Sequence, residues 1–205
     1  MSAPGKPVVA LIGGIGSGKS RIAAELVRRG GYVIPGDQLG HEALRQPHIR
    51  AEVVRRWGSE VLDAAGEVDR KKLGRRVFAD PAELKALEAL VFPWIERRFA
   101  EETAAARADP AVRVIVLDAA ILLEAGWRKF CDRVVYVHAP RPARLRRLAE
   151  QRGWGAKEVE GRERAQLSLT EKASRADDAL DNSGSPDDIS RQVDGLLRRW
   201  GLAPA

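Results

Sequence analysis

Cysteine and long apolar runs are what this sequence lacks. Its 205 residues include one cysteine, Cys131, which excludes a disulfide framework within the chain and is typical of a reducing compartment. No uninterrupted apolar run approaches the roughly 20 residues that a membrane-spanning helix needs. Residues 1–6 also lack the apolar stretch of a signal peptide. We therefore expect a cytoplasmic protein without a membrane partner.

Charged residues are frequent, and the basic ones slightly outnumber the acidic ones. Lys and Arg number 35 against 29 Asp and Glu, which gives a formal net charge of +6. Such a surplus fits a nucleic acid, a phosphate-rich small ligand or an ordinary solvated surface. Because the sequence contains no recognisable RNA-binding motif, we expect no nucleic-acid partner. The residues give no indication of an oligomeric state. The length favours one domain with an insertion.

Short apolar runs alternate with helical patterns along the chain. Residues 8–12 are predicted to form a buried strand, residues 19–29 a helix and residues 32–34 a second strand. Further strands are expected at residues 112–117, 134–137 and 178–181. A strand, a helix and a strand at this spacing form a βαβ unit. The predicted fold is therefore α/β, a P-loop NTPase-type parallel sheet with helices on both faces.

A helix-rich stretch of about residues 38–107 separates the second strand from the third. Asp80 and Pro81 resemble a helix start, with a capping carboxylate and a proline in the first turn. Pro93 lies inside the helical pattern that follows, which predicts a kink or break near residues 91–92. Later helices are expected at residues 142–152, at about 156–170 and after the Ser-Pro-Asp-Asp sequence of residues 185–188.

Residues 13–20 carry the strongest functional signal. They read GGIGSGKS and satisfy the pattern G-x-x-x-x-G-K-[ST] between a strand and a helix. Glycines let successive N–H groups surround phosphate oxygens, and the helix N-terminus adds its positive dipole end. Lys19 can reach the β- and γ-phosphates, and the Ser20 hydroxyl can bind Mg²⁺. The sequence therefore predicts ATP and Mg²⁺ at Gly14, Ile15, Gly16, Ser17, Gly18, Lys19, Ser20 and Arg21.

Asp37 follows the second predicted strand. Ligands of open parallel sheets bind beyond the carboxyl ends of the strands, where this carboxylate can deprotonate an attacking hydroxyl. Asp37 can equally cap a helix that starts at Gln38. The spacing does not decide between these two roles.

Further charged residues are candidates for contacts with phosphate or metal. Arginine forks match phosphate oxygens in pairs, and a helical segment that carries them can close over a triphosphate. These arginines are Arg144, Arg146, Arg147, Arg152, Arg162 and Arg164. Because neighbouring residues of a helix point in different directions, we expect about half of them to be functional. Asp118 and Glu124 are either metal-directed carboxylates or loop and capping residues.

Other motifs follow the P-loop in order. They lie at residues 33–37, 68–78, 121–124, 134–137, 166, 172, 176–177 and 181–182. Together with GGIGSGKS they resemble the motifs of the dephospho-CoA kinase family. The resemblance covers about residues 8–197.

The resemblance implies the last step of coenzyme A biosynthesis, in which ATP phosphorylates the ribose 3′-hydroxyl of dephospho-CoA. Position by position, Asp37 matches the catalytic base, Lys19 and Ser20 the triphosphate and magnesium residues, and Arg147 a lid arginine that meets ATP. Asn182 falls in a loop near the adenine. The implied regions are a nucleotide-binding core of residues 1–38, 108–144 and 167–205, a helical acceptor-binding insertion of residues 39–107, and a lid of residues 145–166.

The sequence departs from the family pattern at four sites. Pro35 and Gly36 replace the first two residues of an Asp-Ala-Asp motif, and Phe92 replaces a histidine. Ala120 replaces a proline of the family pattern, and Arg21 replaces the threonine that follows the P-loop serine. These departures leave open a P-loop kinase for another small hydroxyl acceptor, such as a nucleoside or nucleotide. A nucleic-acid-binding NTPase is a further alternative that only the net charge suggests.

Overall fold

The computed structural model describes residues 5–164 and 166–202. The chain falls into two compact units. The first, here called the sheet unit, comprises residues 1–35 and 103–205, and the second, the helical unit, comprises residues 36–102.

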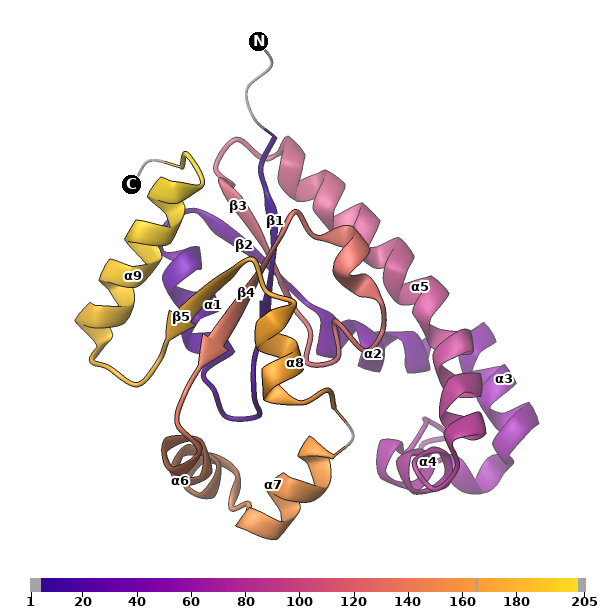
Figure 1. The fold of residues 1–205 in the computed structure, drawn as a ribbon. Coiled ribbons are helices and arrows are strands. Elements are labelled where there is room, and N and C mark those ends of the chain that lie inside the picture. Colours follow the sequence, from indigo (N-terminus) through magenta and orange to yellow (C-terminus); the bar gives the residue numbers. More distant parts are fainter. Residues whose placement is uncertain (1–4, 165, 203–205) are drawn as a thin grey trace. The chain divides into compact units, whose positions relative to one another are not determined.

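Five parallel strands form the sheet, in the order β2-β3-β1-β4-β5 (Figure 1). The strands are β1 (Val8–Ile12), β2 (Gly31–Pro35), β3 (Val114–Asp118), β4 (Arg133–His138) and β5 (Asp178–Asp181). In the central strand β1, Leu11 pairs with Asp118 of β3 on one side and with Val135 of β4 on the other. The predicted α/β fold with a parallel sheet is therefore confirmed.

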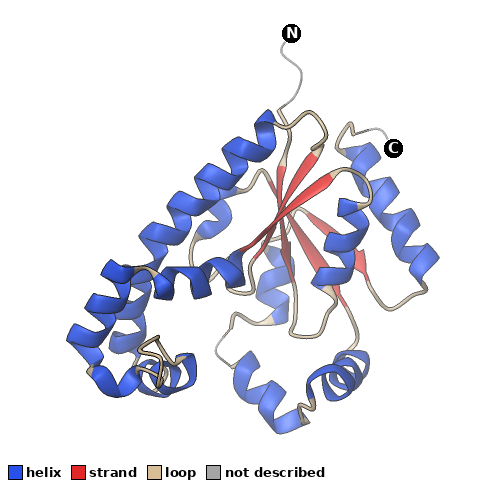
Figure 2. Cartoon of the chain, turned by 180° about the vertical axis from the view of Figure 1, so that it is seen from behind, coloured by secondary structure: helices blue, strands red, loops and turns tan. Residues whose placement is uncertain are grey.

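The helices and turns of the sheet unit follow or precede its strands, and Figure 2 shows them from behind. They are α1 (Lys19–Val27), η2 (Trp127–Phe130), α6 (Arg141–Arg152), α7 (Ala156–Glu163), α8 (Leu169–Ser174) and α9 (Pro186–Arg199). The start of α9 is the predicted one: Ser185 Oγ accepts a hydrogen bond from the Asp188 amide at 3.2 Å, and the Asp188 carboxylate accepts one from the Ser185 amide at 2.9 Å. This reciprocal capping box satisfies two amides that the helix itself leaves without partners.

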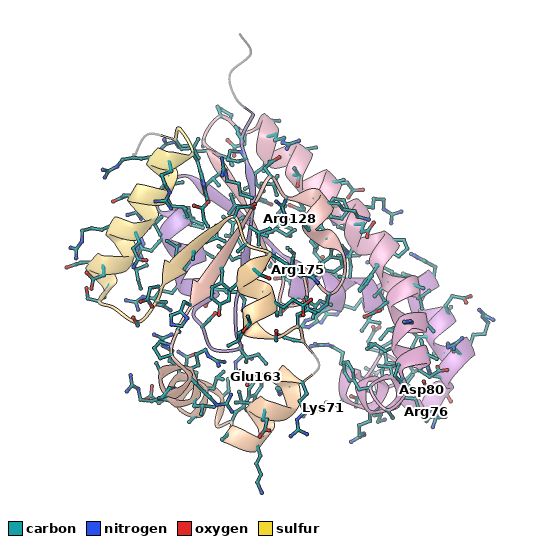
Figure 3. The ribbon with its side chains drawn as sticks, viewed as in Figure 1. Lys71, Arg76, Asp80, Arg128, Glu163 and Arg175 are labelled. Atoms are coloured by element: carbon teal, nitrogen blue, oxygen red, sulfur yellow. The ribbon has the colours of Figure 1, made fainter. Side chains whose placement is uncertain are left out.

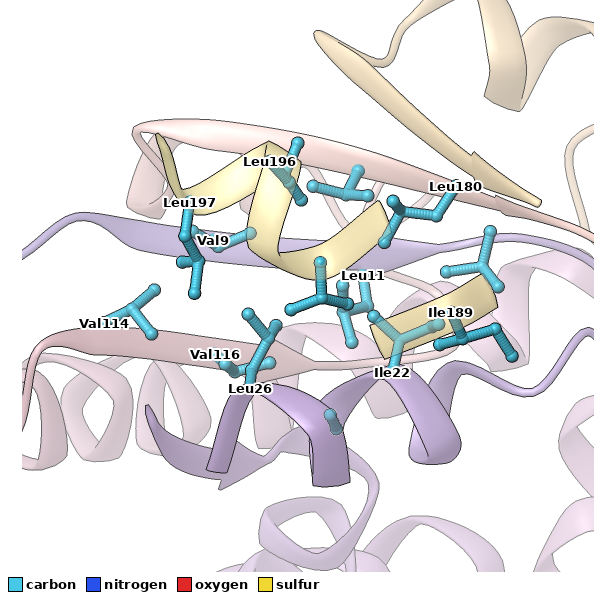
Figure 4. Packing of buried hydrophobic residues seen from close by; sticks show 14 residues of the cluster. Val9, Leu11, Ile22, Leu26, Val114, Val116, Leu180, Ile189, Leu196 and Leu197 are labelled. Atoms are coloured by element: carbon cyan, nitrogen blue, oxygen red, sulfur yellow. The ribbon is translucent and has the colours of Figure 1, made fainter. Parts of the chain in front are cut away.

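The main core lies between the sheet and the helices α1 and α9 (Figure 4). Alternate residues of β1, Val9 and Leu11, face these helices and are fully buried. Val8, Ala10 and Ile12 point to the opposite face and are also buried. Burial of both faces explains why β1 is apolar at every position rather than at alternate ones. Each fully buried leucine or isoleucine contributes about 1.5–3 kcal/mol to the stability of this layer.

One helix predicted for the sheet unit is wrong. Residues 156–170 were expected to form a single helix, but α7 ends at Glu163 and α8 begins at Leu169. Ser168 accepts a hydrogen bond from the Glu171 amide at 3.1 Å and so caps a new helix. A serine satisfies such an amide better from outside a helix than from within one.

The helical unit contains α2 (Gly36–Arg45), α3 (Pro47–Trp57), η1 (Ser59–Val61), α4 (Arg70–Val77) and most of α5 (Pro81–Ala108). Asp80 accepts a hydrogen bond from the Ala82 amide at 2.8 Å, in agreement with the predicted start of α5. The helix continues through Pro93, so the predicted break is wrong, and the alternative prediction of a kink stays a prediction. Proline cannot donate to the carbonyl of Ala89 four residues earlier, but Ala89 is exposed and its carbonyl can bond water. None of the helices described here is long and apolar enough to span a membrane.

Candidate active site

The P-loop connects β1 to α1 at the carboxyl edge of the sheet. Gly13, Gly16 and Gly18 have φ angles of 148°, 76° and 90°, a region of backbone conformation that favours glycine. The Ser17 amide closes a turn by donating to the Gly14 carbonyl at 3.0 Å. Gly18 is the N-cap of α1, so Lys19 and the residue after it occupy the first turn of a helix, where amides have no partner within the helix. This arrangement is an anion site.

Two arginines of α6 bind the carbonyl groups of the P-loop. Arg144 donates from Nη1 to the Ile15 carbonyl at 3.0 Å. Arg147 lies with its Nη1 3.4 Å from the carbonyl oxygens of both Gly16 and Ser17. Because the C=O and the following N–H of a planar peptide point in opposite directions, these contacts turn the next amides away from α6. The helix therefore orients the loop whose amides would contact phosphate.

The glycines of the loop are also required by the close approach of α6. A Cβ on Gly16 would lie 2.9 Å from the Arg144 carbonyl oxygen and 2.9 Å from Leu148 Cγ. A Cβ on Gly14 would lie 2.9 Å from Arg144 Nη1. Any larger residue at Gly16 must displace α6 or the loop, whereas a larger residue at Gly14 must displace the Arg144 side chain.

Arg147 and Arg144 differ in how their charge is compensated. Arg147 donates to three backbone carbonyls, those of Gly16, Ser17 and Asn182, the last at 2.8 Å. Among the described residues none of its partners is a carboxylate. Arg144 is instead ion-paired with Glu163 of α7. Arg147 thus has no carboxylate partner among the described residues, and its contact with ATP stays a prediction.

The other candidate arginines do not join this group. Arg146 is exposed. Arg152 and Arg162 lie over the ring of Trp154, with Cζ 4.9 Å and 3.9 Å from its centroid. The sixth, Arg164, directly follows α7 and pairs with Glu160 of that helix at 2.9 Å. The structure therefore brings two of the six arginines to the P-loop.

Asn182, which follows β5, is buried beneath the P-loop and is 1% exposed. Its Nδ2 donates to the Ser17 carbonyl at 2.7 Å, and its Oδ1 accepts from Arg21 Nη1 at 3.1 Å. Its own amide donates to the carbonyl of His138 at 2.8 Å. The resemblance placed this residue near the adenine, and its tie to the P-loop backbone was not expected from the sequence.

Replacing Asn182 with alanine is expected to weaken ATP binding about tenfold. The reason is that the Ser17 carbonyl loses its buried donor, which costs about 1–3 kcal/mol where no water replaces it. Titration of ATP into the purified protein by calorimetry measures this change. Ser183→Ala, at the exposed next residue, is the matched control and is expected to bind ATP like the unaltered chain. Equal affinity of both variants for ATP would show that the tie to Ser17 does not shape the site.

The two candidate metal carboxylates have different surroundings. Asp118 ends β3 beside Leu11 of β1, the strand that leads into the P-loop. Glu124 forms an ion pair with the buried Lys172 ammonium at 3.0 Å and accepts a hydrogen bond from the Leu167 amide at 2.9 Å. These contacts give Glu124 a structural role, and a metal-binding role of Asp118 stays a prediction.

Lys172 of α8 is a residue whose role sequence reasoning missed. Its side chain is 2% exposed, and Nζ donates to Gln166 Oε1 at 2.9 Å in addition to Glu124. It also lies 3.5 Å from the carbonyl of Ala120. The signal in the sequence was the pair of motif positions 166 and 172, which the structure joins through a hydrogen bond beside the buried ion pair of Lys172 with Glu124.

Asp37 belongs to the helical unit and lies in the first turn of α2. Because α2 begins at Gly36, Asp37 is inside the helix, and the alternative that it caps a helix starting at Gln38 is wrong. Its side chain is exposed. One turn later, burial and the nearby Arg70 lower the pKa of His41, while Asp37 acts in the opposite direction. His41 is therefore neutral at pH 7 and adds no positive charge beside Asp37.

A parallel sheet in this order, with a glycine-rich loop after its first strand and arginines bound to that loop, defines a P-loop kinase. The sequence model of dephospho-CoA kinase matches residues 7–188. The chain belongs to the dephospho-CoA kinase family, as its motifs suggested.

Individual relatives agree with this assignment. A dephospho-CoA kinase of Anaeromyxobacter dehalogenans is 41% identical over 194 residues, which cover 93% of this chain and 90% of the relative. A dephospho-CoA kinase of Methylococcus capsulatus is 37% identical over 97% of this chain and 98% of its own length. Among solved structures, a protein of Thermus thermophilus is similar with a TM-score of 0.81 and 36% identity, covering 96% of this chain and 98% of that one.

Proposed function

We propose that this chain transfers the γ-phosphoryl group of ATP to the ribose 3′-hydroxyl of dephospho-CoA and so forms coenzyme A. The observation that carries the proposal is the P-loop between β1 and α1, in a chain whose family match covers residues 7–188. The alternative acceptors that the sequence left open are not favoured by this match. ATP is the phosphoryl donor that a kinase of this family uses.

In the proposed reaction the 3′-oxygen forms a bond to the γ-phosphorus, and the bond from that phosphorus to the β–γ bridging oxygen breaks. ADP is the leaving group, and the hydroxyl proton passes to the carboxylate of Asp37. Lys19 and amides of the P-loop, other than those of Ser17 and Arg21, which donate to carbonyls of the loop, stabilise the negative charge of the phosphates. Arg147 adds a guanidinium that no carboxylate among the described residues neutralises.

Magnesium is part of the proposal. The described residues contain no group of three or more His, Cys, Asp or Glu side chains that could hold a metal by themselves. Mg²⁺ in phosphoryl-transfer sites usually takes one or two protein oxygens together with phosphates and waters. Ser20, which is exposed in the first turn of α1, and Asp118 offer such oxygens. When bound, the ion would neutralise charge on the β- and γ-phosphates.

The three regions suggested by the resemblance remain part of this proposal. Residues 1–38, 108–144 and 167–205 are the nucleotide-binding core, residues 39–107 the acceptor-binding insertion and residues 145–166 the lid. A cytoplasmic location suits an enzyme of this chemistry with a single buried cysteine.

The deciding experiment is a coupled assay of ADP formation with purified protein, ATP, Mg²⁺ and dephospho-CoA, with the product identified by mass. The expected result is stoichiometric ADP and a product heavier than dephospho-CoA by one phosphoryl group. A panel of nucleosides and nucleotides serves as the comparison. Faster phosphorylation of any of these than of dephospho-CoA would contradict the proposed acceptor.

A further inference from the structure

An ion pair on α7 reaches the P-loop through one arginine. Glu163 is the last residue of α7 and is labelled in Figure 3. Its two carboxylate oxygens accept hydrogen bonds from arginines of α6, Arg144 and Arg141, the latter at 2.8 Å. Arg144 donates from the same Nη1 to the carbonyl of Ile15 in the P-loop. A chain of contacts therefore runs from α7 through α6 to the nucleotide loop.

Arg144 depends on Glu163 more than a surface arginine would. The Arg144 side chain is 3% exposed and that of Glu163 is 21% exposed. Arg144 Nε is buried and has no hydrogen-bond partner among the described residues. A buried guanidinium is stable only when a charge compensates it and its donors are used. Glu163 provides the compensating charge, and within residues 5–164 and 166–202 the Ile15 carbonyl is the other hydrogen-bond partner of the guanidinium.

The carboxylate of Glu163 is ionised at neutral pH. Burial alone would raise the pKa of Glu163, but the hydrogen bonds from Arg144 and Arg141 hold it below its ordinary value. The charge that Arg144 needs is thus present under the conditions in which ATP would bind.

We propose that Glu163 is a positioning residue for ATP: it keeps Arg144 on the Ile15 carbonyl and thereby fixes the P-loop in its phosphate-binding shape. The proposal rests on the proposed use of the P-loop for ATP and extends it to a residue that touches no phosphate. Without the negative charge, the buried guanidinium must turn toward water. The Ile15 carbonyl then loses its donor, and the peptide that presents the Gly16 amide is no longer held.

The two P-loop arginines of α6, Arg144 and Arg147, have different roles in this arrangement. Glu163 neutralises Arg144, which serves the backbone of the loop. Arg147 has only carbonyl partners among the described residues and keeps its charge for the triphosphate. The negative charge of Glu163 would repel bound phosphate if it were not compensated. Its ion pairs with Arg141 and Arg144 compensate that charge.

The test is Glu163→Gln in the full-length protein, with ATP·Mg²⁺ binding measured by calorimetry in the absence of acceptor. We expect the affinity for ATP to fall about tenfold, which is less than the loss on truncating one partner of a buried charged pair, because glutamine removes the charge but keeps a hydrogen-bond acceptor. Glu158→Gln is the matched control. Glu158 lies on the same helix and pairs with Arg162 at 3.1 Å, but both side chains are about half exposed, 46% and 51%. This control is expected to bind ATP as the unaltered chain does.

A second measurement separates positioning from stability. In steady-state assays Glu163→Gln is expected to raise the KM for ATP and to leave the KM for dephospho-CoA unchanged. A lower Tm with an unaltered ATP affinity would overturn the proposal, as would equal losses in Glu163→Gln and Glu158→Gln. Failure of the unaltered protein to phosphorylate dephospho-CoA while it binds ATP would contradict only the proposed function. Failure to bind ATP at all would overturn both.

Discussion

Replacing Lys19 with alanine is expected to lower kcat/KM for phosphoryl transfer by about 10³-fold, the order of loss seen when a preorganised group is removed from transition-state charge. Lys19 lies in the first turn of α1, directly after the left-handed Gly18. Its ammonium is proposed to contact the β- and γ-phosphates, between which charge moves during transfer. Steady-state kinetics with varied ATP, together with calorimetric ATP binding, measures the loss.

The fold of Lys19→Ala should be retained, because Lys19 is only partly buried and the core of α1 is made by Ile22, Ala23 and Leu26. Arg28→Ala is the matched control: it removes a basic side chain at the end of the same helix that is 64% exposed and pairs with Glu25. Glu25 is itself buried, but it also pairs with Arg29 at 2.7 Å, so the loss of Arg28 leaves its charge compensated. Turnover of Lys19→Ala equal to that of Arg28→Ala would refute the phosphate role of Lys19.

The sequence predicts most strands and the P-loop because both depend on local patterns. Residues 8–12 are apolar without interruption and are followed by glycines, so the prediction for β1 matches Val8–Ile12 residue by residue. The capping box at Ser185 is likewise contained in four neighbouring residues. Such features need no knowledge of distant parts of the chain.

The contacts that shape the P-loop could not be predicted in this way. Asn182 binds the carbonyl of Ser17, which is 165 positions away. Glu163 contacts Arg144, which in turn contacts the loop, and from sequence Glu163 is one of several carboxylates on a charged helix. Side chains that bond a backbone carbonyl leave no pattern in their own neighbourhood, because the partner is any residue that the fold brings there.

Two departures from the family pattern have a structural explanation. Ala120 contacts Lys172 through its backbone carbonyl, which lies 3.5 Å from Lys172 Nζ. Any residue at this position has the same carbonyl. Arg21 donates to Asn182 Oδ1 and so orients the amide whose Nδ2 reaches Ser17. The residue that replaces a threonine therefore supports the P-loop by another route. Nothing in the structure explains the phenylalanine at position 92.

Replacing Asp37 with asparagine is expected to lower kcat by about 10²–10⁴-fold, the usual contribution of a general base. Asparagine has the same shape but cannot accept the hydroxyl proton. Asp37 is exposed in the first turn of α2, so the change removes a favourable charge at a helix N-terminus and costs about 0.3–1 kcal/mol of stability. The measurement is single-turnover transfer from ATP to dephospho-CoA.

ATP affinity distinguishes a base from a residue that only supports the nucleotide. If Asp37 acts on the acceptor hydroxyl, Asp37→Asn should bind ATP within about threefold of the unaltered chain, since the loss falls on the chemical step. Glu42→Gln is the matched control. The Glu42 carboxylate lies on the same helix and accepts a hydrogen bond from Gln38 at 3.0 Å. This variant should leave both the ATP affinity and the rate of transfer unchanged. Collapse of ATP binding in Asp37→Asn with undiminished transfer from each bound complex would show that the carboxylate is not the base. The proton would then have to pass to another group.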